Sequence, residues 1–126
     1  MKKTYKISSD DLSSSLTVEI DHDLLTDAGL HEINNFWSSA KQLLRDHDGN
    51  VLHAVLDRLF TAIIRIQMSE GFTVDGLIQF FDYSNRDWRG DTEGWPKMDG
   101  TEGIKIIETD DLDLSDFSLD FCEVPQ

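Results

Sequence analysis

The chain has 126 residues, and its 25 acidic against 11 basic side chains give a formal net charge of -14. Such a surface repels nucleic acid and anionic membranes, so we expect direct binding to neither. No stretch approaches the about 20 apolar residues of a membrane span, and the one cysteine, Cys122, cannot form an internal disulfide. We therefore predict a single acidic domain over residues 1–126 in the cytoplasm.

Two short stretches near the N-terminus alternate between apolar and polar residues. They are TYKIS at 4–8 and LTVEI at 16–20. A period of two is typical of half-buried β-strands, and the two strands are expected to form a hairpin. The serines at 13–15 leave the position of its turn open.

Three helices are expected next along the chain. Thr26 is a good N-cap, and an apolar stripe runs from there to about Arg45. Residues 51–68 repeat apolar side chains at three- and four-residue steps around most of the helix, which predicts a central helix covered by other elements. Gly71 is suited to end that helix, and Thr73 to cap a short third one.

The C-terminal part begins with a long irregular stretch and ends in strands. Residues 83–103 show no periodicity but contain two tryptophans, and loops of this length are usually functional or mobile. A strand is expected at 103–109, where Ile107 interrupts the alternation and indicates either a bulge or cover on both faces. A last strand is expected from Phe117, where apolar and other residues alternate through Cys122, to near Pro125. This order predicts an α+β fold, with an antiparallel or mixed β-sheet from the N- and C-terminal strands covered on one face by three central helices.

Three segments of the chain resemble a known family. LTDAGLHEINNFW at 25–37, GNVLHAVLDRLF at 49–60 and EGWPKMDGTEGIKI at 93–106 are similar to segments of short bacterial proteins without an assigned function, which phages and prophages frequently encode. The family has no known catalytic or binding residues, so it transfers no site. The resemblance implies an accessory protein of a mobile element in a bacterial cytoplasm.

The first candidate binding surface is the acidic tail, which carries no Lys or Arg after Lys105. A row of carboxylates at strand spacing can imitate backbone phosphates and attract a positive surface. We therefore predict a protein–protein interaction module that binds a basic host protein, such as one that handles nucleic acid. Alternatively, the charge serves only solubility. The candidate residues are Asp110, Asp111, Asp113, Asp116 and Asp120.

A homo-oligomeric structural or accessory protein without catalytic activity is the rival class. Phe117, Leu119 and Phe121 alternate along the last expected strand. An apolar edge of this kind would let two copies pair as a homodimer across a two-fold axis.

The second candidate binding surface lies in the irregular stretch. Trp88, Arg89 and Trp95 are residue types enriched at the energetic centres of protein interfaces. The alternative is that the tryptophans hold this loop on the core, while its arginines pair with Asp87 and Asp91.

The histidines and the cysteine give little support for an enzyme. His22 and His47 each lie between two aspartates and would offer metal ligands if the two turns met, but Asp is also a common turn residue. Cys122 adjoins Glu123, whose charge disfavours the thiolate that a nucleophile needs. The aspartates at 110–116 lack the glycine and terminal glutamate of a calcium loop. We expect no cofactor and no metal, and a small metal-dependent enzyme is the least favoured alternative.

Overall fold

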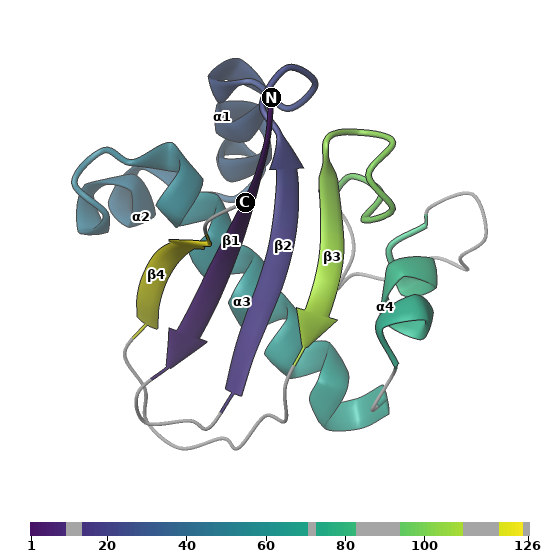
Figure 1. Ribbon diagram of the computed structural model, residues 1–126. Helices are drawn as coiled ribbons and strands as arrows, with labels where there is room; N and C mark the ends of the chain where they lie inside the picture. Colours follow the sequence, from purple (N-terminus) through teal and green to yellow (C-terminus); the bar gives the residue numbers. More distant parts are fainter. Residues whose placement is uncertain (10–13, 71–72, 83–93, 110–118, 125–126) are drawn as a thin grey trace.

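A computed structural model describes residues 1–9, 14–70, 73–82, 94–109 and 119–124 (Figure 1). The predicted α+β class, with a sheet made of N- and C-terminal strands and helices between them, is confirmed. The elements in chain order are β1 (Lys2–Ser9), β2 (Ser14–Asp21), α1 (Asp27–Asn35), α2 (Ala40–Asp46), α3 (Val51–Glu70), α4 (Val74–Phe80), β3 (Ile104–Thr109) and β4 (Leu119–Val124).

The strands form one antiparallel sheet in the order β3-β2-β1-β4. The predicted hairpin is β1–β2, in which Tyr5 lies opposite Val18 and Ile7 opposite Leu16. All four side chains are buried, as the period of two requires. The two C-terminal strands then flank the hairpin, with β3 along β2 and β4 along β1.

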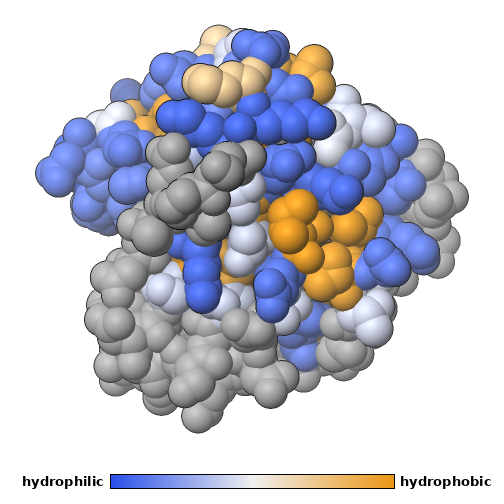
Figure 2. Space-filling view, viewed as in Figure 1, coloured by the Kyte–Doolittle hydropathy of each residue, from blue (hydrophilic) through white to orange (hydrophobic). Residues whose placement is uncertain are grey.

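A β-bulge explains the break in alternation within β3. Val18 pairs with Ile106, whereas the preceding Thr17 pairs with Glu108, so Ile107 is the extra residue. Its side chain is 41% exposed. Figure 2 shows that the described residues on this side of the molecule are mainly hydrophilic, with one large hydrophobic patch near β3 and smaller hydrophobic areas toward the top of the view.

Helix α3 is the centre of the core and crosses behind the sheet (Figure 1). It confirms the predicted central helix and its spacing of apolar side chains, each of which contributes about 1.5–3 kcal/mol when fully buried. Although α3 is apolar, no helix in the described ranges is long and apolar enough to cross a membrane. Its buried residues are Val51, Ala54, Val55, Leu56, Leu59, Phe60, Ile63, Ile64 and Ile66.

The single helix expected between Thr26 and about Arg45 is wrong, because α1 ends at Asn35 and α2 begins at Ala40. We call the four residues between them, 36–39, the elbow. Asn34 is fully buried, and its Nδ2 donates a hydrogen bond to the Ala40 carbonyl oxygen at 3.2 Å. Side chains of Asn compete in this way with helical backbone bonds, and the chain folds back instead of continuing as one helix. The described residues therefore form four helices where three were predicted.

Both predicted N-caps are confirmed. The Thr26 hydroxyl accepts a hydrogen bond from the Gly29 amide at 3.3 Å, and the Thr73 hydroxyl accepts one from the Gly76 amide at 3.2 Å. Each bond satisfies a donor that the first turn of a helix leaves open. Gly71, the predicted end of α3, lies outside the described residues.

Candidate functional site

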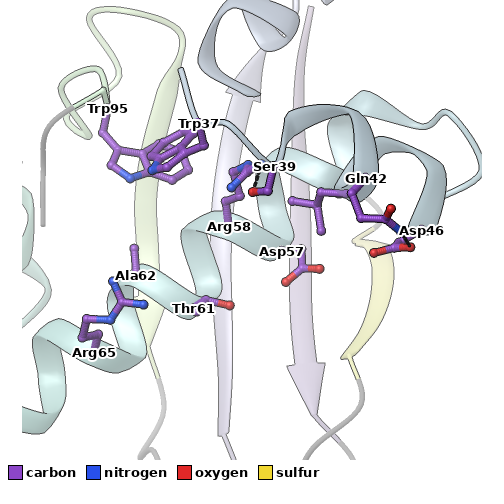
Figure 3. A pocket seen from close by; sticks show the side chains of 11 residues that line it. Trp37, Ser39, Gln42, Asp46, Asp57, Arg58, Thr61, Ala62, Arg65 and Trp95 are labelled. Carbon is purple, nitrogen blue, oxygen red and sulfur yellow. Dashed lines mark hydrogen bonds between the residues drawn. The ribbon is translucent and has the colours of Figure 1, made fainter. Parts of the chain in front are cut away.

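A groove of about 390 Å³ opens between α2, α3 and the elbow, and we call it the tryptophan groove. Figure 3 shows Trp37, Trp95 and Arg65 toward one end of it and Gln42 and Asp46 toward the other. Aromatic rings and guanidinium groups are the side chains most enriched at interface hot spots. The groove therefore has the composition of a recognition surface.

Arg58 fixes the elbow against α3. Its guanidinium carbon lies 4.8 Å from the centre of the Trp37 ring. Its Nε donates to Asn34 Oδ1 at 2.8 Å, and its Nη2 donates to Ser39 Oγ at 3.2 Å, the bond that Figure 3 marks. Burial lowers the pKa of Arg58, while the charge of Asp57 acts in the opposite direction. One side chain thus holds the wall of the groove by stacking and by two directed hydrogen bonds.

The tryptophans anchor the groove in the core. Trp95 is 5% exposed, and its ring centre lies 5.2 Å from that of Trp37 and 6.5 Å from that of Phe81. Arg65 stands beside this cluster on the exposed side of α3, where no described residue pairs with its guanidinium. Arg65 is therefore available to an incoming partner.

The histidines do not assemble a metal centre in the described part of the chain. His47 Nε2 lies 2.8 Å from Asp57 Oδ2, whereas His22 Nε2 lies 2.8 Å from the Tyr5 hydroxyl. The two Asp-His-Asp turns thus have different partners. Among the described residues, no group of three or more His, Cys, Asp or Glu side chains is placed to hold a metal ion.

His53 makes stability dependent on pH. Burial, and next the nearby charge of His47, lower its pKa below the ordinary value of 6.5. The unfolded chain binds this proton more readily, so the stability from neutral His53 is complete above the unfolded-state pKa and is lost as the pH falls toward the folded-state value. We expect His53→Gln to reduce the loss of stability between about pH 7.5 and about pH 5.5, as measured by urea unfolding. An unchanged pH dependence in this variant would contradict the prediction.

Most of the predicted site residues lie outside the described ranges. They are Trp88, Arg89, Asp110, Asp111, Asp113 and Asp116. For Asp120 only the backbone is described, and it pairs with Ser8 at the edge of the sheet.

The sequence interpretation missed the arginines of the groove, although the sequence itself contained a signal for them. Arg58 and Arg65 are two of the polar residues in a largely apolar helix, and they stand two turns apart. Residues seven apart share a helical face, so this spacing places both arginines on one side of α3. What the sequence does not reveal is that Trp37 and Trp95 lie on the same side.

Comparison with known proteins identifies a family and two relatives, one from a phage and one from a prophage. The family described as "Protein of unknown function (DUF2528)" matches residues 15–119. "Protein ea10" of Escherichia phage lambda and "Lambda prophage-derived protein ea10" of Escherichia coli O6:H1 are each 42% identical to the chain over 106 residues, which is 84% of this chain and 84% of the relative. No solved structure matches the chain. The predicted resemblance is thereby confirmed: the chain has relatives in a phage and a prophage, and it belongs to the DUF2528 family of proteins of unknown function.

Proposed function

We propose that the chain is a non-catalytic protein–protein interaction module that binds a basic protein of the bacterial host. The observation that carries the proposal is the tryptophan groove, where Trp37 and Trp95 meet Arg58 and Arg65. Such clusters dominate the binding energy of many interfaces.

The groove is built on fixed side chains, which favours tight binding. The hydrogen bonds of Arg58 to Asn34 and Ser39 already order the wall before a partner arrives. Ordering an interface side chain upon binding costs about 0.5–1.5 kcal/mol, and a preformed wall avoids that loss.

The net charge of -14 supports a basic partner. Long-range attraction raises the association rate with a positive surface, and salt screens it over about 10 Å at 0.1 M ionic strength. The relatives are a lambda protein and an Escherichia coli prophage-derived protein, which makes Escherichia coli lysate the appropriate source of partners.

Affinity capture from that lysate tests the proposal. We expect wild-type chain to retain a basic host protein at about 50 mM salt and to release it as salt rises to about 500 mM. Arg65→Ala makes the chain more negative, which alone would favour a basic partner, but it also removes the exposed side-chain contact of the groove, and this loss should lower the amount retained at least about fivefold. Lys41→Ala removes one exposed positive charge from α2 outside the groove and should retain the wild-type amount.

Three results would count against this function. The wild-type chain could retain no host protein, the amount retained could be the same at low and high salt, or Arg65→Ala and Lys41→Ala could retain equal amounts. The last result would separate a generally acidic surface from recognition in the tryptophan groove.

A further inference from the structure

A second groove lies on the other side of the elbow, between α1 and the segment at 94–102, and we call it the acidic groove. Its volume is about 390 Å³. Leu25, Ile33 and Trp95 form a buried apolar floor. Leu24 and Phe36 also line it, and they are 60% and 51% exposed. The groove therefore leaves two large apolar side chains open to solvent.

The charge around this apolar floor has one sign. Glu32 and Glu102 line the groove, and among its described lining residues there is no Lys, Arg or His. Glu102 is held in place, because its Oε2 accepts a hydrogen bond from the Lys97 amide at 2.7 Å. The Lys97 ammonium group lies 3.8 Å from Asp82 and does not line the groove. An apolar floor beside two carboxylates, one of them held in place, complements an apolar side chain flanked by positive charge.

Two residues that line the acidic groove, Leu25 and Phe36, pack closely against glycine backbone. A Cβ atom on Gly94 would lie 2.5 Å from the Phe36 ring, and one on Gly103 would lie 2.7 Å from the Leu25 amide nitrogen. Both glycines have positive φ angles, +89° and +98°. Phe36 at the rim and Leu25 in the floor are therefore held against glycine backbone, so the groove is largely formed before binding.

We infer that the acidic groove docks a basic–apolar segment of a partner protein. One or two apolar side chains fill the hollow between Leu24 and Phe36, and flanking Lys or Arg residues pair with Glu32 and Glu102. The nine residues of α1 span about 13 Å, which matches about four extended residues of a partner. This inference rests on the proposed function and names the part of the basic partner that is recognised.

A second copy of the chain fits this groove poorly. Two acidic grooves meeting across a two-fold axis would bring Glu32 and Glu102 of each copy together. Like charges at an interface oppose association, and the net charge of -14 on each copy adds to the repulsion. A basic segment is therefore the occupant that the charges favour.

A labelled synthetic peptide with the sequence KKLFKK is the probe for this docking site, read by fluorescence anisotropy. We expect the combined Glu32→Gln and Glu102→Gln variant to bind it about tenfold more weakly or worse, because both charge pairs are lost. Phe36→Ser should weaken binding by a similar factor through loss of the apolar contact. The peptide KKSSKK should bind wild-type protein about tenfold more weakly, because it keeps the charge and lacks the apolar pair.

Matched variants elsewhere on the surface separate the groove from general acidity. The pair Asp75→Asn and Glu108→Gln removes the same charge from exposed positions on α4 and β3, and Ile107→Ser removes an exposed apolar side chain. Each control should change peptide affinity by less than about twofold. Circular dichroism and thermal unfolding show whether each variant is folded. If Phe36→Ser does not fold, the combined Glu32→Gln and Glu102→Gln variant still tests the docking site.

Several outcomes would overturn the inference. They are failure of KKLFKK to bind wild-type protein, equal binding of KKSSKK, and equal weakening by the control charge pair. None of these depends on a host protein, so the acidic groove can be rejected while capture through Arg65 stands. Conversely, intact peptide binding with no host protein captured would reject the proposed function and leave the groove as a basic-segment site.

Discussion

Replacing Gly103 by alanine should lower the free energy of unfolding by about 3 kcal/mol or more. Its φ of +98° is unfavourable for any side chain, and the new Cβ would lie 2.7 Å from both the amide nitrogen and the Cβ of Leu25. The backbone cannot withdraw freely, because the Gly103 carbonyl accepts a hydrogen bond from the Asp21 amide at 2.8 Å. Strain and overlap therefore add, and urea unfolding of purified wild-type and variant chains measures their sum.

Gly49→Ala is the matched control for this prediction. Gly49 also has a positive φ, +81°, but no described atom lies within 4 Å of the position that a Cβ would take. It should lose only about 1 kcal/mol, from conformational strain alone. Equal losses at the two positions would show that the contact between Gly103 and Leu25 does not matter for stability.

The regular elements were predictable because their signals are local. Alternation identified the β1–β2 hairpin, and three- and four-residue spacing identified α3. The N-caps at Thr26 and Thr73 were also predictable, because threonine is one of the residues preferred at the N-cap of a helix. Even the bulge at Ile107 appeared as a break in phase, although the sequence alone left a second explanation open.

The elbow was not predictable from spacing. The apolar stripe continues through Phe36, Trp37 and Ala40 as though one helix ran on. The break depends on Asn34, which contacts the backbone of Ala40 and receives a hydrogen bond from Arg58, a residue 24 positions away. Periodicity describes one element at a time and cannot detect a polar contact between two of them.

The candidate site could not be predicted for the same reason, because it depends on contacts between separate elements. Sequence neighbours directed attention to the tryptophan and arginine at 88–89, because composition can only be judged along the chain. Trp95 instead contacts Trp37, and the elbow and the crossing of α3 decide which side chains share their groove. A recognition surface made by three segments becomes visible only when the packing of those segments is known.

Replacing Asn34 by alanine should lower the free energy of unfolding by about 3 kcal/mol, because the buried Asn34 side chain makes hydrogen bonds to both Arg58 and Ala40. The Arg58 Nε donor and the Ala40 carbonyl would both lose their hydrogen-bond partner. A side chain with no exposed surface would also leave a cavity. Urea unfolding measures the loss, and tryptophan fluorescence, to which all three tryptophans contribute, reports whether their surroundings change.

Asn35→Ala tests whether position or residue type causes this effect. Asn35 is the exposed neighbour at the end of α1, and its replacement should change stability by no more than about 0.5 kcal/mol. Arg58→Ala supplies the second arm of a double-mutant cycle. Because Asn34 and Arg58 share one hydrogen bond, the double variant should lose less stability than the sum of the two single variants. Additive losses would mean that the two side chains act independently. The elbow would then be held by the aromatic contacts of Trp37 rather than by the hydrogen bond between Asn34 and Arg58.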